Sequence, residues 1–167
     1  MTSAQSQSQS TSTSTVNDAI ALLTKDHSDV KKLFKSYQEL ADGEASAAPR
    51  LAIAHEICEA LTLHAIVEEE IFYPALREAA QDTQNELDEA VVEHGTVKEL
   101  VEQIKAMDPE ENLYNAKVKV LGEYVDHHAK EEEAEMFPKA KASGIDLAGL
   151  GLEMKERKEE LQLLTVD

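Results

Sequence analysis

Four segments of this chain repeat apolar residues at three- and four-residue spacing, which is typical of amphipathic helices. Each of the four stripes also contains one histidine, and two stripes contain a glutamate four residues after it. The stripes are Ile20, Leu23, His27, Val30, Phe34 and Tyr37; Ile57, Leu61, His64, Glu68 and Ile71; Leu87, Val91, His94, Val97, Val101 and Ile104; and Val118, Leu121, Val125, His128, Glu132 and Met136. The pattern predicts an all-α fold.

Local signals mark the ends of these helices. The predicted starts lie near Asn17, Pro49, Thr83 and Asp108, and the predicted ends lie near 42–44, Pro74 and Pro138. Thr83 with Glu86 is predicted to form a capping box, and Asp108 is predicted to cap a helix whose first residue is Pro109. A short fifth helix is expected from about Leu150 to Leu164, as a lid or packing helix.

The second half of the chain repeats the first. His27 opens HSDVKKL and His94 opens HGTVKEL, while His64 opens HAIVEEEIFYP and His128 opens HAKEEEAEMFP. Short connections between long helices favour antiparallel neighbours, so we expect an up-down-up-down four-helix bundle with a pseudo-two-fold internal repeat and a short C-terminal helix. The expected organisation is a disordered Ser/Thr/Gln-rich tail over 1–16, the bundle over 17–142 and a C-terminal extension over 143–167.

Composition excludes several classes of function. The net charge of −18 would repel phosphate backbones and anionic lipids, so neither nucleic acid nor a membrane is expected as a partner. The N-terminus lacks the basic start and apolar core of a secretory signal, and we expect a cytoplasmic protein. The single cysteine, Cys58, rules out an internal disulfide and is interpreted as a buried filler rather than a reactive thiol.

The helical periodicity directs ionisable groups into the core. His64 and Glu68 share one helix face, as do His128 and Glu132, because residues four apart lie above one another. Together with His27 and His94, the core would hold four imidazoles and two carboxylates, with no Lys or Arg on the same stripes. Burying an unpaired carboxylate is very costly. We therefore predict a metal centre, for which iron, zinc and manganese all suit the mixed imidazole and carboxylate ligands.

A lone histidine on an apolar stripe is more often a hydrogen-bonded core residue than a ligand, so the prediction depends on the whole set. His55 and Glu59 also show the four-residue spacing but fall off the stripe, and we interpret them as a surface ion pair. Glu69, Glu70, Glu131 and Glu133 are expected to be solvated or to accept hydrogen bonds from the ligating imidazoles, and His127 is expected at the surface.

The order H…HxxxE…H…HxxxE resembles the hemerythrin HHE cation-binding domain over roughly residues 17 to 142. The resemblance implies two iron ions (Fe²⁺/Fe³⁺) bridged by Glu68 and Glu132 and by an oxo or hydroxo group. It also implies that His27 and His64 bind one iron, and that His94 and His128 bind the other. Oxygen-carrying hemerythrins have a fifth histidine one turn along the third helix, where this chain has Lys98.

The missing histidine implies an open coordination position, which suits turnover better than reversible oxygen carriage. Tyr73 is a further candidate, either as a phenolate ligand or as a packing residue. An ideal helix would point it about half a turn away from His64, so ligation needs a local distortion near Pro74. Its counterpart in the second repeat is Phe137.

Three functions follow. The first is a non-haem di-iron protein, redox-active toward hydrogen peroxide or nitric oxide, with a catalase-like activity relevant to oxidative stress. The second is an oxygen or iron sensor, or an oxygen carrier, that binds without catalysis. The third is a metal-storage or structural bundle. In each of the first two the partner is a small molecule, O₂, H₂O₂ or NO, and the oligomeric state is left open.

Overall fold

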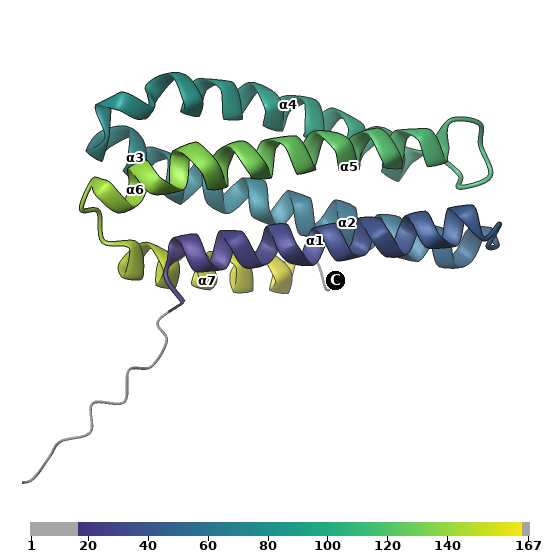
Figure 1. Ribbon diagram of the computed structural model, residues 1–167. Helices are drawn as coiled ribbons and strands as arrows, with labels where there is room; N and C mark the ends of the chain where they lie inside the picture. The colour runs from purple at the N-terminus through teal and green to yellow at the C-terminus, as the bar shows by residue number, and fades with distance from the viewer. Residues whose placement is uncertain (1–16, 165–167) are drawn as a thin grey trace, which may run out of the picture.

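The computed structural model describes residues 17–164, and every regular element in that range is a helix. The four long helices are α1 (Ala19–Asp42), α2 (Ala47–Val67), α4 (Gln84–Ala106) and α5 (Tyr114–Glu131). They run antiparallel to their neighbours around a common core (Figure 1). The predicted all-α bundle is therefore confirmed. The tail predicted over 1–16 lies outside the described residues.

Two helices continue past the prolines predicted to disturb them. After α2 the chain forms the π-helical turn η1 (Glu68–Phe72) and then α3 (Tyr73–Ala79), and after α5 it forms η3 (Glu132–Met136) and then α6 (Phe137–Ala142). In each π turn a backbone N–H bonds the carbonyl five residues earlier, Tyr73 to Glu68 and Phe137 to Glu132. Proline follows each of these bonds, and it lacks the N–H that a regular α-helix would use there.

Two predicted caps are wrong. Helix α4 begins after Thr83, but the Thr83 hydroxyl donates to the Ala80 carbonyl within the 3₁₀ turn η2 (Gln81–Thr83) instead of capping α4. Helix α5 begins at Tyr114, not after Asp108, because residues 108–113 form turns closed by the Asp108 and Glu111 side chains. The cap that does form on α1 is Asp18, whose carboxylate accepts a hydrogen bond from the Ala21 backbone N–H at 2.8 Å.

Two apolar clusters fill the bundle. One contains Leu23, Phe72, Leu76, Leu87, Phe137 and Met154, and the other contains Tyr37, Ile57, Leu61, Ile104, Tyr114 and Leu121. Cys58 belongs to the second cluster, and burial raises the pKa of its thiol to about 11, which fits the predicted filler role. Val91 is 48% exposed, so its assignment to a core stripe is wrong.

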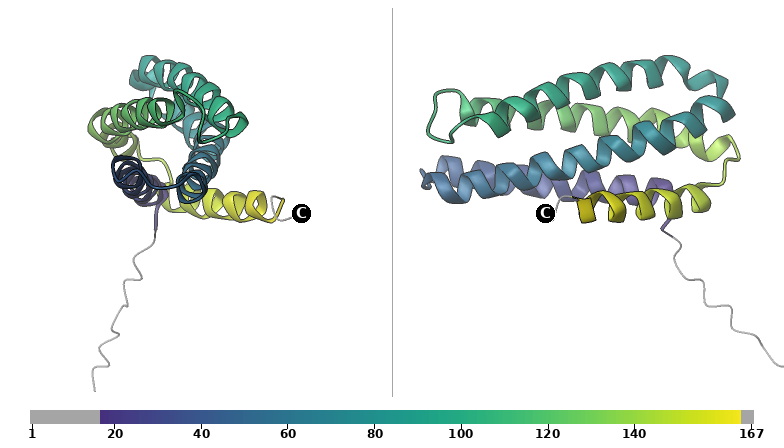
Figure 2. Two further views of the ribbon diagram at one scale, coloured as in Figure 1. Left: turned by 90° about the vertical axis from the view of Figure 1, so that its right-hand side faces the viewer. Right: turned by 180° about the vertical axis from the view of Figure 1, so that it is seen from behind.

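Helix α7 (Leu147–Leu164) packs outside the bundle against α1 and α2. It begins three residues earlier than predicted because the Asp146 side chain caps it by accepting from the Gly149 N–H at 2.9 Å. Gly151 permits the close crossing, since a Cβ there would lie 2.6 Å from the Asn17 carbonyl oxygen. Figure 2 shows that α7 lies on the α1 and α2 side, whereas α4 and α5 lie on the opposite side of the bundle.

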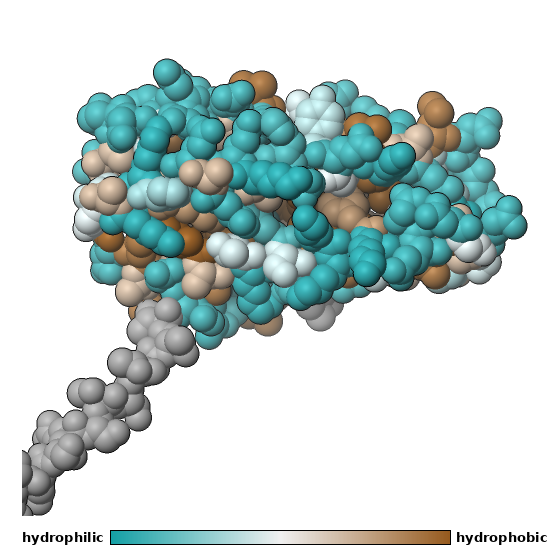
Figure 3. Space-filling view, viewed as in Figure 1, coloured by the Kyte–Doolittle hydropathy of each residue, from teal (hydrophilic) through white to brown (hydrophobic). Residues whose placement is uncertain are grey.

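The surface seen in Figure 3 is mainly hydrophilic, with apolar side chains in the seam between α1 and α5. A groove of about 620 Å³ follows this seam, and Phe34, Val118 and Gly122 contribute to its walls. Among the helices of residues 17–164, none is both long and apolar enough to cross a membrane.

Candidate metal centre

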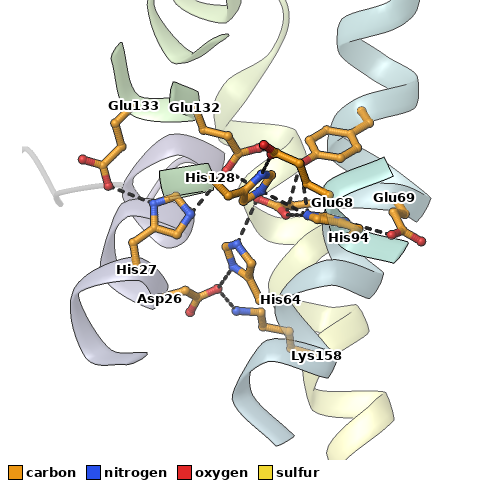
Figure 4. Close-up of polar contacts among 12 residues, drawn as sticks. Asp26, His27, His64, Glu68, Glu69, His94, His128, Glu132, Glu133 and Lys158 are labelled. Carbon is orange, nitrogen blue, oxygen red and sulfur yellow. Dashed lines mark hydrogen bonds and ion pairs between the residues drawn. The ribbon is translucent and has the colours of Figure 1, made fainter. Parts of the chain in front are cut away.

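The six predicted metal ligands meet in one layer between the two apolar clusters. His27 comes from α1, His64 from α2, His94 from α4 and His128 from α5, while Glu68 and Glu132 open the two π turns. Each of the six is at most 8% exposed. Figure 4 shows their side chains pointing toward one another from separate helices. The layer is therefore polar in composition and almost closed to solvent.

Each buried glutamate contacts imidazoles from both halves of the repeat. The Glu68 Oε1 atom lies 3.1 Å from His64 Nε2, and its Oε2 atom lies 3.2 Å from His94 Nε2. The Glu132 Oε2 atom lies 3.3 Å from His27 Nε2 and 3.6 Å from His128 Nε2. The two carboxylates therefore join the halves of the bundle across its pseudo-two-fold axis.

The outward nitrogen of every imidazole contacts an acid on another helix. The Nδ1 distances are 2.8 Å from His27 to Glu133, 3.0 Å from His64 to Asp26, 2.8 Å from His94 to Glu69 and 2.6 Å from His128 to Glu93. A carboxylate at Nδ1 accepts that proton and leaves Nε2 facing inward, which is the tautomer a metal ligand needs. The whole layer is thus oriented for coordination.

Sequence reasoning anticipated half of these acids. Glu69 and Glu133 do contact imidazoles, but Asp26 and Glu93 were missed. The signal was present, because both repeats place an acid immediately before a histidine, as Asp26–His27 and Glu93–His94. Each of these acids bonds the histidine of an adjacent helix and not the histidine that follows it in the sequence.

The other residues of the acidic runs lie outside the layer. Glu70 pairs with Arg157 of α7 at 2.7 Å, and Glu131 contacts the exposed ring of His127 at 3.2 Å. His55 and Glu59 are both exposed on α2, as expected, but within the described residues they form no ion pair, so that part of the prediction is wrong.

Tyr73 points into the layer because of the π turn before it. An α-helix turns about 100° per residue, so the extra residue of η1 rotates Tyr73 back toward the side of His64. Its hydroxyl donates to Glu132 Oε1 at 2.7 Å and lies 3.3 Å from His94 Nε2. The counterpart Phe137 instead stacks on His27, with ring centroids 6.0 Å apart. The centre is therefore asymmetric in this respect.

The charges in the layer perturb one another strongly. Burial alone would raise the pKa of Glu68, yet the charges of His64 and His94 lower it well below its usual value. Burial would likewise lower the pKa of His64, but Glu68 and Asp26 outweigh it and raise that pKa to about 10. Positive charge on the imidazoles thus offsets the negative charge of the carboxylates. A bound cation would take over this role.

Three buried atoms in the layer bear on whether a metal ion would fit there. His27 Nε2, Glu68 Oε1 and Glu132 Oε2 are inaccessible to solvent and have no hydrogen-bond partner among the described residues. The donors form two sets with mutual distances within 4.8 Å, one of His27, His64, Glu68 and Glu132, and one of Glu68, His94 and His128. Mixed nitrogen and oxygen donors of this kind fit iron, manganese or zinc.

A cavity of about 350 Å³ reaches this layer from the side of α1, α2 and α7. All four imidazoles line it, and Asp26 and Lys158 lie on its wall. The Lys158 ammonium contacts Asp26, which also bonds His64. A small molecule can therefore approach the inward nitrogens without unfolding the bundle.

An antiparallel bundle with a buried layer of four histidines and two glutamates defines a cation-binding helical protein. The chain belongs to the hemerythrin HHE cation binding domain family, whose model matches residues 18–140. A hemerythrin HHE cation binding domain-containing protein from Mycobacterium kansasii has a similar solved structure, with a TM-score of 0.70 and 25% identity over 86% of each chain.

A second similar protein is considerably longer than this chain. A protein named DNA nickase from Nostoc sp. (strain PCC 7120 / SAG 25.82 / UTEX 2576) is 32% identical over 118 residues, which is 70% of this chain. The match covers 31% of that relative, so the chain spans about a third of its length.

Proposed function

We propose that this layer holds two iron ions and that the centre reacts with hydrogen peroxide or nitric oxide. His27 and His64 would bind one ion, His94 and His128 the other, and Glu68 and Glu132 would bridge them, with an oxo or hydroxo group completing the bridge. The observation that carries the proposal is the convergence of six buried imidazole and carboxylate side chains, three of whose atoms have no hydrogen-bond partner among the described residues. The sharing of Glu68 by both donor sets supports a dinuclear centre over a mononuclear one.

Bound iron would supply the electrons for such chemistry by alternating between its ferrous and ferric states. The chain itself positions the imidazoles and excludes bulk water. The four acids at the Nδ1 atoms hold the imidazoles with Nε2 inward, and the apolar clusters on either side keep bulk water away. Tyr73 holds a proton against Glu132 Oε1, and burial together with the charges of Glu68 and Glu132 raises the pKa of its phenol well above the usual value.

Two features favour turnover of a small oxidant. The set contains four histidines where oxygen carriers have five, and Lys98, at the position of the fifth, instead pairs with Glu69 at 2.6 Å. The cavity that reaches the imidazoles has room for peroxide or nitric oxide. Both support an open coordination position rather than a saturated one.

Metal analysis with peroxide turnover tests the proposal. The purified protein should contain two irons per chain, absorb in the near ultraviolet and evolve oxygen from peroxide. His64→Ala should lower iron content and oxygen evolution by at least about tenfold, because it removes a ligand outright. His55→Ala is the matched control, since His55 is exposed on the same helix. If His64→Ala keeps its iron and its activity, the proposal fails.

The second candidate is a binding module that senses or carries oxygen. One observation favours it: the matching segment makes up 31% of a longer relative, so a domain of this type also occurs as part of a larger chain. In that case the diferrous protein would bind oxygen reversibly, and its spectrum would return on degassing. Irreversible oxidation on the first exposure would argue against this candidate.

A further inference from the structure

A groove between α4 and α5 leads to the centre from the side opposite α7. Its volume is about 230 Å³, and its walls carry six glutamates, namely Glu86, Glu89, Glu93, Glu131, Glu132 and Glu135. His128 also lines it, so two residues of the buried layer form part of its wall. Lys139 pairs with Glu86, two helical turns from Glu93 along α4. The groove is thus an acidic approach to the centre.

Three side chains at the groove form what we call the outer cluster: Glu93, His127 and Glu131. Their donor atoms lie within 4.8 Å of one another. The His127 Nε2 atom is 3.2 Å from Glu131 Oε1 and 3.9 Å from Glu93 Oε1, and the His127 side chain is 62% exposed. One imidazole and two carboxylates at this spacing match the ligand types of a divalent transition-metal site.

The outer cluster is linked to the buried layer through a single residue. Glu93 directs Oε1 toward His127 and places Oε2 at 2.6 Å from His128 Nδ1. Beyond it, Glu132 lines the groove while only 2% exposed, and its Oε2 atom has no hydrogen-bond partner among the residues described. A cation at the outer cluster would therefore share the groove with a buried carboxylate, one of whose oxygens has no hydrogen-bond partner among the described residues.

The internal repeat shows that this arrangement belongs to one half only. The positions equivalent to His127 and Glu131 in the first half are Leu63 and Val67, which cannot bind metal. Asp26, the equivalent of Glu93, is paired with Lys158 of α7. On the α1–α2 face, helix α7 places the Lys158 ammonium beside this acid. The α4–α5 face instead offers imidazole and carboxylate groups with a surplus of negative charge.

We propose that the α4–α5 groove is the route by which divalent cations reach the centre, and that the outer cluster binds them transiently on the way. The inference rests on the proposed function, because it needs a metal centre to load. A groove lined by charges of one sign between low-dielectric walls concentrates the opposite ion and raises its association rate. The cavity on the opposite face is lined by fewer acids, namely Asp26, Asp29 and Glu56, and Lys158 pairs with Asp26 there, so the stronger attraction for cations lies on the α4–α5 side.

The test is the loading rate of the full chain prepared without metal. Co²⁺ is added at low ionic strength, and its visible absorption follows uptake. The double variant His127→Ala/Glu131→Gln removes two of the three ligands of the outer cluster and no residue of the buried layer. The double variant His55→Ala/Glu59→Gln is the matched control, because it makes the same changes to an exposed pair at the same spacing on α2. Far-ultraviolet circular dichroism checks that all three forms are folded.

We expect the outer-cluster variant to load about tenfold more slowly than the parent, with the same final Co²⁺ content, and the control to load at the parental rate. Added NaCl should slow the parent more than the variant. Release of Co²⁺ from the loaded proteins to excess chelator should be slowed as well, which makes the result independent of the metal-free fold.

Equal loading and release rates in the parent and the outer-cluster variant would overturn this route while leaving the centre itself in place. An equal slowing in the control would overturn it too, since the effect would then follow surface charge alone. Uptake by none of the three forms would overturn the proposed function along with the route.

Discussion

At the scale of single residues, pairs of histidine and carboxylate organise the centre. Every inward imidazole is held by an acid at Nδ1, and two of these acids also contact a lysine, Asp26 with Lys158 and Glu69 with Lys98. The equivalent acids in the other half, Glu93 and Glu133, differ in their surroundings, because Glu93 faces His127. The two halves of a repeated sequence therefore provide unequal environments for the two proposed ions.

Tyr73 gives this asymmetry a testable consequence. Its hydroxyl lies within 3.4 Å of both the Glu68 and the Glu132 carboxylates, and a cation placed between them would stabilise the phenolate. We expect the ferric protein to show a visible phenolate-to-iron absorption band that Tyr73→Phe abolishes while iron content is kept. Tyr37→Phe, at a buried tyrosine that bonds Asn115, should keep the band. A band that survives in Tyr73→Phe would limit this residue to its hydrogen bond with Glu132.

At the scale of elements, the two π turns place functional residues. Each begins with a buried glutamate of the layer and ends just before an aromatic residue that faces the centre, Tyr73 in one half and Phe137 in the other. The prolines that follow remove a backbone donor, and the longer turn accommodates that loss. A distortion that costs helical regularity thus directs an additional side chain into the layer.

The start of α5 carries backbone strain that can be relieved. Leu113 precedes the helix with φ of 75°, a left-handed conformation that costs a non-glycine residue about 1–2 kcal/mol, and its side chain is 67% exposed. Glycine avoids that cost but loses more entropy on folding, so we expect Leu113→Gly to stabilise the protein by about 0.5–1 kcal/mol. Urea denaturation should show a higher midpoint with an unchanged slope.

Leu113→Ala is the control, because alanine retains the penalty for positive φ while removing the exposed apolar surface. Its free energy of unfolding should stay close to that of the parent. A gain with alanine as large as that with glycine would assign the effect to the side chain rather than to the backbone.

At the scale of the whole molecule, α7 makes the bundle one-sided. It covers α1 and α2, and Arg157 and Lys158 join it to Glu70 and Asp26 at the edge of the centre. The α4–α5 side keeps an acidic groove. The approach to the centre therefore differs in charge between the two faces, although the bundle itself is built from a repeat.

The docking of α7 depends on Gly151. A Cβ at this position would meet backbone atoms of residues 17–19 at 2.6–2.9 Å, which no side-chain movement can relieve. We expect Gly151→Ala to lower the free energy of unfolding by about 1–3 kcal/mol. Gly95→Ala should act in the opposite direction, by about 0.5–1 kcal/mol, because Gly95 is an exposed helical position with open space around it. Thermal unfolding of both variants provides the measurement, and a neutral Gly151→Ala would contradict the close crossing.

The sequence was sufficient for the features that depend on local periodicity. Stripes at helical spacing identify which face of each helix turns inward, and the repeat aligns the two halves, so the bundle and the meeting of His27, His64, Glu68, His94, His128 and Glu132 in one layer were predictable. Their role as metal ligands stays a prediction. Helix caps were less predictable, because Thr83 and Asp108 carry the right side chains but use them in neighbouring turns.

Tertiary structure alone decided which acid bonds which histidine. Asp26 and Glu93 bond histidines of other helices, and the identity of such a partner depends on how the helices are rotated and staggered, which no single stripe records. The same holds for α7, which packs on α1 and α2 and not on α4 and α5. Periodicity is a property of one helix, whereas packing is a property of several, so the asymmetry that α7 adds to the sequence differences between the two halves arises from packing.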